Sequence, residues 1–171
     1  MHLGDYQIRN EAPSDAKHIH QVTELAFKDA PHSDHTEQFI VKSLRESGAL
    51  TVSLVAELEG EIIGHVAISP VSITDGSDDW YGLGPISVLP EYQGKGVGSK
   101  LMKRALADLD AKGALGCVVL GDPAYYARFG FKVIEGLTFP DVPPEYFQAL
   151  SFNENFPQGD VTYQKAFSAK G

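Results

Sequence analysis

Hydrophobic and polar residues recur with different periods along the chain, and the period predicts the type of element. Residues 6–9 alternate with a period of two, which predicts a first strand. Ile19, Val22 and Ala26 then recur at helical spacing and predict a first helix. Residues 36–45 place their apolar side chains on one side, which predicts a second, amphipathic helix. The N-terminal part of the chain is therefore expected to run strand, helix, helix.

The middle of the chain carries two β-rich segments, residues 51–58 and 61–69, on either side of Glu59-Gly60. A glycine-containing pair between two such segments predicts a β-hairpin. Residues 80–88 supply a further strand, which Pro90 ends because proline has no N–H group to donate to a sheet.

The pattern then becomes helical over residues 98–112, where the apolar stripe ends at Gly113. Residues 117–120 form a short, wholly apolar run of the kind that is buried on both faces of a sheet. Residues 123–129 predict a short helix with proline at its first position, and residues 131–134 predict a strand.

The last part of the chain has little periodicity. Residues 138–160 hold four prolines and predict an extended arm, and residues 163–167 predict a last strand. The order of elements predicts an α/β (α+β) protein with a mixed central β-sheet flanked by helices on both faces. We expect one domain over residues 1–171, with residues 138–171 as a C-terminal arm and last strand.

Composition and charge narrow the class of protein. A chain of 171 residues is the size of one ordinary domain. The formal net charge of -9 argues against nucleic-acid binding, which needs a basic face, and suits a cationic acceptor. No apolar run approaches the ~20 residues of a membrane helix, and residues 1–5 lack the features of a signal peptide. We therefore expect a cytoplasmic protein with no nucleic-acid or membrane partner; its single cysteine, Cys117, allows no internal disulfide.

One segment points to specific chemistry. The strand that ends at Val88 leads into the glycine-rich run Gln93-Gly94-Lys95-Gly96-Val97-Gly98-Ser99 and then directly into a helix. Glycines at alternate positions leave successive backbone N–H groups uncovered by side chains. Together with the positive end of the following helix, these donors form an anion site that suits a pyrophosphate, and Lys95 adds a cation at its rim.

Two familiar phosphate-binding loops fit this run less well. A Walker loop needs four residues between a glycine and Gly-Lys-Ser/Thr, but the run from Gly94 to Gly98 is too short. A dinucleotide fingerprint needs a third glycine where this chain has Ser99, and its acidic residue is matched only in part by Asp122. Several predicted strands also precede the run, whereas the dinucleotide loop follows the first strand of its fold.

The run resembles the central signature of the GNAT superfamily of N-acetyltransferases, Gln/Arg-x-x-Gly-x-Gly/Ala between a strand and a helix. Gln93, Gly96 and Gly98 match that signature. Residues 126–131, Tyr-Ala-Arg-Phe-Gly-Phe, resemble the family's tyrosine followed four and five residues later by Gly-Phe. The order of elements fits the family from residue 6 to about residue 134. The resemblance implies a GNAT-like fold that uses acetyl-CoA as cosubstrate.

The resemblance also implies individual roles. In the family the strand before the loop splays from its neighbour, so the Ile86 N–H would bond the thioester carbonyl and Val88 the pantetheine amide. One such donor stabilises an oxyanion by on the order of 3 kcal/mol. Tyr126 would protonate the departing thiolate as general acid; its neighbour Tyr125 fits the family spacing less well. The implied cofactor-binding residues are Ile86, Ser87, Val88, Gln93, Gly94, Lys95, Gly96, Val97, Gly98, Ser99 and Tyr126.

The general base is less defined. Many relatives carry a glutamate on the strand before the loop, but residues 80–88 contain none. His65 is the candidate, because its pKa range suits proton acceptance near neutral pH; the alternative is a structural core histidine. Glu24, His35 and Glu37 lie near the loop where family members bind the acceptor, and the alternative for each is an ordinary solvated surface.

No metal site is expected. His18 and His20 are two residues apart, which does not bring them to one helical face, and His32 and His35 share a loop without cysteines. Asp122 stands where the family often has an asparagine, so the contact of that asparagine is not carried over.

The predicted function is transfer of an acetyl group from acetyl-CoA to a primary amine by direct attack in a ternary complex. One alternative is a sensor that binds acyl-CoA on the same fold without turnover, and another is a nucleotide-binding α/β protein. Polyamines, antibiotics, amino acids and protein N-termini all remain open as acceptors. Residues 139–147, rich in proline and aromatic side chains, are expected to line the acceptor cleft or to pair with a second subunit in a homodimer.

Overall fold

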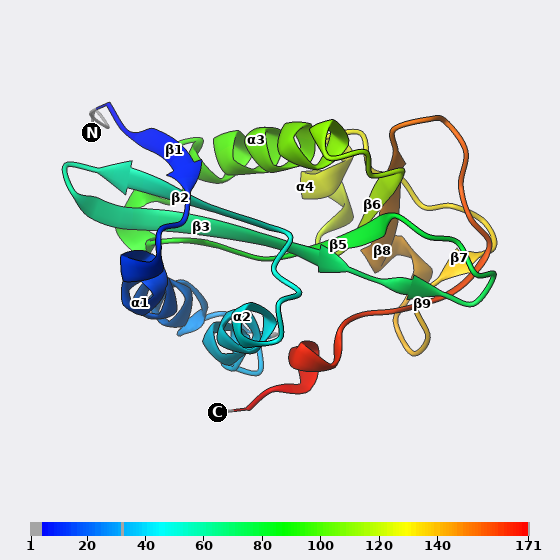
Figure 1. The fold of residues 1–171 in the computed structure, drawn as a ribbon, viewed down its shortest axis with the longest axis horizontal. Helices are drawn as coiled ribbons and strands as arrows, with labels where there is room; N and C mark the ends of the chain where they lie inside the picture. Colours follow the sequence, from blue (N-terminus) through cyan, green and yellow to red (C-terminus); the bar gives the residue numbers. More distant parts are fainter. Residues whose placement is uncertain (1–4, 32, 171) are drawn as a thin grey trace.

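A mixed β-sheet with helices on both faces forms the centre of the computed structural model (Figure 1). The structure describes residues 5–31 and 33–170. The expectation about a signal peptide concerns residues 1–4, which lie outside these ranges. His32, one of the two histidines considered in the loop, lies outside them as well. The six strands follow the order β1-β2-β3-β5-β6-β8, and all neighbours are antiparallel except β5 and β6. The predicted fold class is confirmed.

The first half of the sheet follows the predicted pattern closely. Its strands are β1 (Gln7–Asn10), β2 (Val52–Leu58), β3 (Glu61–Pro70) and β5 (Trp80–Val88). The turn between β2 and β3 has positive φ at both central residues, 50° at Glu59 and 83° at Gly60. Such a turn matches the twist of a two-residue hairpin, which confirms the hairpin prediction.

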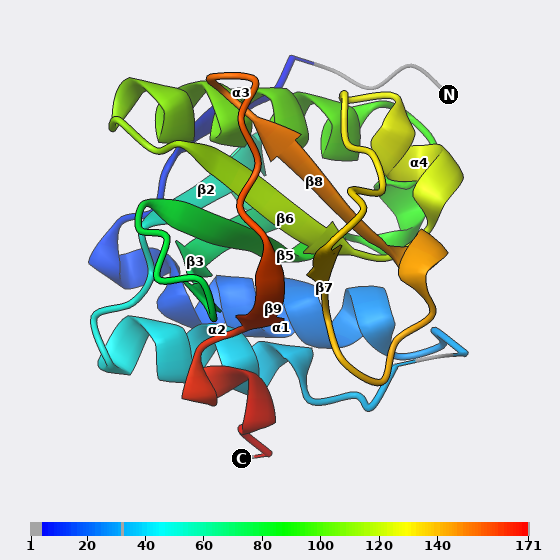
Figure 2. The same ribbon diagram turned by 90° about the vertical axis from the view of Figure 1, so that its right-hand side faces the viewer.

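Helices cover the two faces of the sheet in pairs (Figures 1 and 2). After a short 3-10 turn, η1 (Pro13–Asp15), α1 (Ala16–Phe27) and α2 (Glu37–Glu46) lie on one face, here called the α1 face. On the opposite face, the α3 face, lie α3 (Val97–Ala111) and α4 (Pro123–Ala127). Within the described ranges, none of the helices has the length and apolar character needed to cross a bilayer.

Alternation along β3 decides which side chain reaches which face. A Cβ atom at Gly64 would lie 3.0 Å from a methyl group of Leu101 on α3, so Gly64 faces α3. His65, the next residue, therefore faces α1. Its directly opposite neighbour on β5 is Ser87, which shares that face.

The C-terminal part differs from the sequence prediction. Within the expected extended arm, η3 (Pro144–Tyr146) leads into β8 (Phe147–Ser151), which pairs antiparallel with β6 (Gly116–Leu120) as the edge strand of the main sheet. The expectation of an extended arm is wrong over this stretch. β8 is only five residues long and follows two prolines, so its own pattern is too short to predict a strand. The strand predicted at residues 131–134 is reduced to a single bridge between Lys132 and Ala149.

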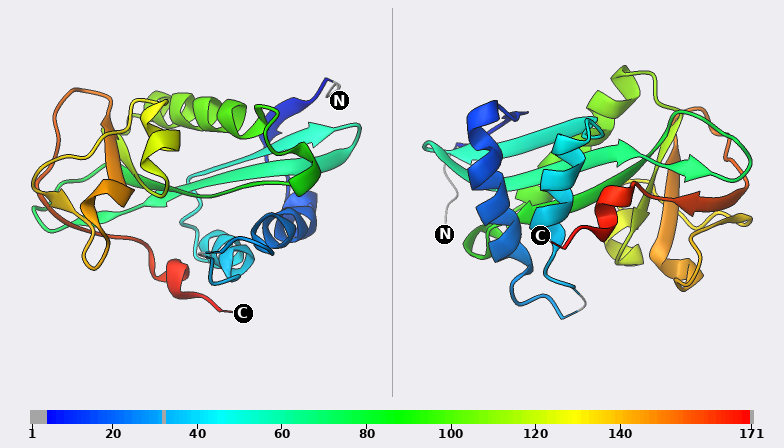
Figure 3. Two further views of the ribbon diagram at one scale, coloured as in Figure 1. Left: turned by 180° about the vertical axis from the view of Figure 1, so that it is seen from behind. Right: turned by 60° about the horizontal axis from the view of Figure 1, so that its bottom comes forward.

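A second, small sheet joins three short strands in the order β4-β9-β7: β4 (Ser72–Ile73), β9 (Gly159–Thr162) and β7 (Leu137–Thr138). The last strand predicted at residues 163–167 is wrong, because β9 ends at Thr162 and residues 165–168 form the 3-10 helix η4 (Lys165–Ser168). This helix lies beside α2 (Figure 3). The Tyr163 ring, which precedes η4, packs edge to face against Phe167 within it, with ring centroids 5.0 Å apart.

Candidate active site

The parallel strands β5 and β6 separate in the middle of the sheet. Their pairing runs from Trp80 opposite Gly116 to Leu83 opposite Val119. β5 continues to Val88, and in the described chain it has no pairing with β6 beyond Leu83. On its other edge β5 pairs with β3, and between Leu83 and Ile86 it has one residue more than β3 does. This extra residue, at Gly84–Pro85, forms a bulge. The β6-facing edge of residues 84–88 is therefore open to a ligand.

Beyond this splay, the chain turns through η2 (Pro90–Tyr92) into α3 with its backbone donors uncovered. Gly94 and Gly96 adopt φ of 76° and 88°, the left-handed region that glycine enters without strain. Gly96 is the N-cap of α3, and the N–H of Lys100 bonds its carbonyl. The N–H groups of residues 97–99 have no acceptor within the helix, so they are free to bind an anion at the positive helix end.

These elements enclose a cavity of about 340 Å³. Tyr125 closes one side, because its hydroxyl oxygen lies 3.1 Å from where a Cβ at Gly98 would be. The side chain of Gln93 is held in place by a hydrogen bond from its Nε2 to the Val88 carbonyl (2.9 Å). The residues that line the cavity are Val88, Tyr92, Gln93, Gly94, Gly96, Gly98, Ser99, Tyr125 and Arg128.

Six of the eleven predicted cofactor residues line this cavity, and the other five, Tyr126 among them, do not. The Val97 side chain is buried in the core, so only its N–H is available to a ligand. Lys95 is exposed outside the lining. Ile86 and Ser87 lie in the splayed part of β5 instead.

Three residues that line this cavity were not among the predicted cofactor-binding residues: Tyr92, Tyr125 and Arg128. The Arg128 guanidinium lies 4.5 Å from the centre of the Tyr125 ring, and its Nε donates to the Tyr125 carbonyl (3.3 Å). Arg128 adds a cation to the lining of the cavity. The i, i+3 spacing of Tyr125 and Arg128 on a short helix was the available signal.

Tyr126 lies next to this cavity on α4. Its ring packs against Gly121 at the end of β6, with one ring carbon 2.6 Å from where a Cβ would be. The Tyr125 ring meets it edge to face at 5.0 Å. Burial, and secondarily Tyr125 and Asp122, raises the pKa of Tyr126 to about 12. Tyr126 is therefore a phenol that stays protonated at neutral pH. Asp122 caps α4 by accepting the Ala124 N–H (3.0 Å), which gives it a structural role.

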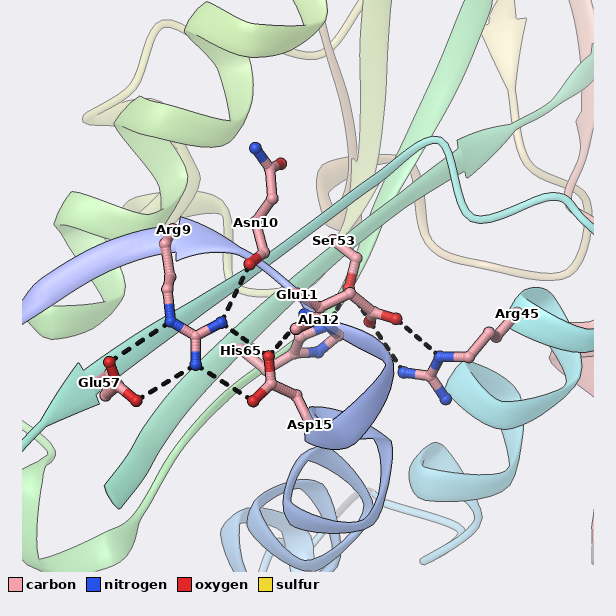
Figure 4. Close-up of polar contacts among 9 residues, drawn as sticks. All are labelled: Arg9, Asn10, Glu11, Ala12, Asp15, Arg45, Ser53, Glu57 and His65. Carbon is pink, nitrogen blue, oxygen red and sulfur yellow. Dashed lines mark hydrogen bonds and ion pairs between the residues drawn. The ribbon is translucent and has the colours of Figure 1, made fainter. Parts of the chain in front are cut away.

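His65, the candidate base, is fully buried on the α1 face. Figure 4 shows the polar network around it: His65 Nε2 lies 2.8 Å from Ser53 Oγ, and Ser53 Oγ donates to the Glu11 carboxylate. Arg45 on α2 binds both oxygens of that carboxylate, at 2.8 and 2.9 Å. Burial lowers the pKa of His65 to about 4, a change that Glu11 opposes and Arg45 reinforces. His65 is therefore neutral at pH 7.

The three acceptor-side candidates are only partly brought together. Glu24 and His35 line a cavity of about 410 Å³ at the connection between α1 and α2, together with Gln38. Glu37 does not line it, because its carboxylate accepts from Ser33 Oγ instead. Across residues 5–31 and 33–170, no three His, Cys, Asp or Glu side chains are grouped as metal ligands.

A sheet that splays beside a glycine-rich anion site at a helix N-terminus defines the class of CoA-dependent acyltransferases, and comparison with known proteins agrees. The family model described as acetyltransferase (GNAT) domain matches residues 50–133. The uncharacterized N-acetyltransferase YhbS of Escherichia coli (strain K12) is 41% identical over 127 residues, covering 74% of this chain and 73% of YhbS. The chain therefore belongs to the GNAT acetyltransferase family, which confirms the resemblance and the enzyme class predicted from sequence.

Two solved structures are similar over nearly the whole chain. A GNAT family acetyltransferase from Brucella melitensis in complex with acetyl-CoA is 50% identical, with a TM-score of 0.87 over 96% of this chain and 99% of that one. The structure of YhbS from Escherichia coli in complex with CoA is 35% identical, with a TM-score of 0.86 over 99% of this chain and 98% of that one. The ligands of these two relatives agree with the predicted cosubstrate.

Proposed function

We propose that the protein transfers the acetyl group of acetyl-CoA to a primary amine, by direct attack of the amine within a ternary complex. The observation that carries the proposal is the cavity of about 340 Å³, lined by glycine backbone and Arg128, beside the open edge of β5. A pyrophosphate fits backbone donors at a helix N-terminus, and an extended pantetheine arm fits an unpaired strand edge.

Each part of the site then has a chemical task. The backbone of residues 93–99 holds the pyrophosphate, and the Val88 N–H on the open edge of β5 donates to pantetheine, whereas the Ser87 backbone faces β3. The Ile86 N–H, next to the bulge in β5, donates to the thioester oxygen as negative charge develops on it. A preorganised donor of this kind contributes on the order of 3 kcal/mol to stabilisation of the transition state.

Proton transfer completes the proposed reaction. The amine nitrogen attacks the thioester carbon, the C–S bond breaks, and Tyr126 donates its proton to the departing thiolate. The amine must lose one proton in the same reaction, and we keep His65 as the residue that receives it. The cytoplasmic location remains a prediction from the sequence, and so does the role of residues 139–147 in lining the acceptor cleft or in pairing with a second subunit.

The acceptor is proposed to be a cationic amine that loses a proton on binding. The net charge of -9 favours the approach of cations. Glu24 and His35, which line the cavity of about 410 Å³ at the connection between α1 and α2 together with Lys28 and Gln38, are the groups proposed to meet the acceptor.

Two measurements test this function. Titration calorimetry should show saturable binding of CoA, and no binding of NAD. A panel of spermidine, an aminoglycoside, free amino acids and peptides with free N-termini is then screened for release of the CoA thiol from acetyl-CoA. Acceleration by at least one amine is expected. CoA binding without acceleration by any amine would support the sensor instead, and binding of NAD alone would overturn the CoA site.

Two glycine substitutions distinguish an effect on CoA binding from an effect of backbone strain on stability. Gly96→Ala and Gly113→Ala act at opposite ends of α3, with φ of 88° and 89° and open space around each Cβ position. Both should cost about 1 kcal/mol of stability, because alanine is strained at positive φ. Of these two glycines, Gly96 lines the cavity and Gly113 does not. We expect Gly96→Ala to weaken CoA binding by roughly tenfold or more, equivalent to about 1.4 kcal/mol, and Gly113→Ala to leave it unchanged. Equal affinities in the two variants would contradict the placement of the pyrophosphate.

A further inference from the structure

Two residues that are paired across β3 and β5 each carry a buried polar atom without a hydrogen-bond partner. Among the described residues, seven buried side-chain polar atoms have no hydrogen-bond partner. Two of them are Nδ1 of His65 on β3 and Oγ of Ser87 on β5, and these two residues are direct partners in the antiparallel register. The exposed fractions are 0% for His65 and 2% for Ser87. The remaining atoms are Tyr6 Oη, Gln38 Oε1, Ser69 Oγ, Gln148 Oε1 and Tyr163 Oη.

An unpartnered polar group in a protein interior is costly, by about 1–3 kcal/mol each. Natural proteins therefore satisfy nearly all such groups, and the exceptions concentrate where function requires them. His65 and Ser87 lie at such a place, because Ser87 directly follows Ile86 on the stretch of β5 that has left β6. A water molecule that bridges opposed polar groups is the usual way to satisfy both.

On the other side of the imidazole, the donor and the acceptor of each hydrogen bond are fixed by the charge of Glu11. Glu11, ion-paired with Arg45, has a lowered pKa: burial raises it, but the hydrogen bonds from Arg45 and Ser53 outweigh burial. As a carboxylate, Glu11 can only accept, so Ser53 Oγ donates to it. Ser53 Oγ must then accept from His65, which places the proton on Nε2 and leaves Nδ1 as a bare acceptor.

We propose that Ser87, His65, Ser53 and Glu11 form a proton relay that carries the proton of the attacking amine away from the reaction centre. The proposal rests on the proposed function and gives His65 the role of a link in a chain. The amine proton passes through water to Ser87 Oγ and then, because Ser87 Oγ and His65 Nδ1 are not hydrogen-bonded to each other, through a bridging water to His65 Nδ1. His65 releases its Nε2 proton to Ser53, and Ser53 releases its hydroxyl proton to Glu11.

For a bound amine that is already neutral, the proton count closes over one turnover, and a flip of the His65 ring returns its remaining proton to the side of Ser53. The amine loses one proton to the relay, and the thiolate gains one from Tyr126. Glu11 passes its proton to solvent, and Tyr126 recovers one from solvent. Glu11 is placed for this exchange, because its side chain is 18% exposed and its partner Arg45 is 27% exposed. Arg45 also lines a cavity of about 530 Å³ between α1 and α2, at the solvent end of the relay.

The neutral state of His65 suits this role. Burial holds the pKa of His65 at about 4, so the imidazole transmits a proton without storing it as a stable cation. The charged groups that act on the ring are Glu11, on the connection between β1 and α1, and Arg45 on α2. All other members of the relay come from the neighbouring strands β2, β3 and β5 of the same sheet face.

The test compares Ser87→Ala with Ser69→Ala. Ser69 is a matched control, because it is fully buried on the same sheet face and its hydroxyl is also unpartnered within the described structure, but it lies away from the relay. The acceptor is the panel amine with the fastest CoA release, or hydroxylamine if no amine exceeds the rate without acceptor. For each variant we measure kcat, the KM for acetyl-CoA, the pH profile and Tm.

We expect Ser87→Ala to lower kcat by roughly tenfold to 100-fold, because a side chain that moves a proton in the rate-limiting step contributes at least that much. Its rate should continue to rise with pH as hydroxide replaces the relay, whereas the wild-type rate levels off. Its Tm should be unchanged or higher, because an unsatisfied hydroxyl is removed. Ser69→Ala should share the effect on Tm only, and Ser87→Thr should recover most of the rate.

The outcomes separate the relay from the function on which it rests. A wild-type protein that neither binds CoA nor releases it would overturn both. A wild-type protein that transfers acetyl groups, with a Ser87→Ala variant of equal kcat and equal pH profile, would overturn the relay alone. A lower Tm with unchanged kcat in Ser87→Ala would likewise assign Ser87 a structural role and overturn the relay.

Discussion

Replacing Tyr126 with phenylalanine is expected to lower kcat for acetyl transfer by about 1000-fold, the middle of the range for a general acid. The substitution removes only the hydroxyl group, so the edge-to-face contacts of the ring with Tyr125 and Phe131 remain. Without the phenol, the thiolate of CoA must leave unprotonated or take its proton from water. The measurement is thiol release under saturating acetyl-CoA, with Tm recorded to show that the fold is retained.

Tyr125→Phe is the matched comparison, because Tyr125 lies next to Tyr126 on α4 but lines the phosphate cavity. It should raise the KM for acetyl-CoA and leave kcat within a few-fold of wild type. The wild-type activity should also show no loss from Tyr126 ionisation up to about pH 10, because burial raises the pKa of this phenol to about 12. A Tyr126→Phe variant with wild-type kcat would remove Tyr126 from the mechanism.

Acidification from pH 7 to pH 4 is expected to lower the free energy of unfolding by about 3 kcal/mol through His65 alone. The pKa of His65 is about 4 in the folded protein and 6.5 as a model value, because burial disfavours the charged ring. Between these values the unfolded chain binds the proton and the folded protein does not. Stability therefore decreases as the pH falls below 6.5, and the His65 contribution is fully lost below pH 4.

Urea unfolding at several pH values measures this effect, and a His65→Gln variant isolates it. Glutamine cannot titrate, so the variant should lose about 3 kcal/mol less than wild type between pH 7 and pH 4, although it starts from a lower stability at pH 7. The exposed residue His18 provides the control, and His18→Gln should retain the wild-type slope. Equal slopes in wild type and His65→Gln would show that the imidazole is not held neutral by burial.

The glycine-rich turn that lines the cavity could be predicted from sequence because it is built from consecutive residues. Gly94, Gly96 and Gly98 create a backbone shape that depends on the absence of side chains, and the helix that follows is evident from its own periodicity. The β2–β3 hairpin was predictable for the same reason, because its turn residues and its two strands are adjacent in sequence.

The contributions that depend on distant contacts could not be predicted in this way. Arg128 reaches the cavity because α4 folds back over the start of α3, which no pattern within residues 123–129 specifies. β8 is stabilised by pairing with β6 along its whole length, from Leu120 opposite Phe147 to Gly116 opposite Ser151. Its five residues are too few to show a period of their own.

His65 shows where sequence reasoning ends and tertiary structure begins. The sequence alone indicated the type of element along most of the chain and the glycine-rich turn at residues 93–99, because these depend on local backbone geometry and side-chain periodicity. The resemblance to the family came from its motif residues. Only the tertiary structure decided that His65 is fully buried, joined through Ser53 to Glu11, and opposite Ser87. Burial and the pairing of strands arise from contacts between residues far apart in the chain, and those contacts determine the protonation state of a side chain.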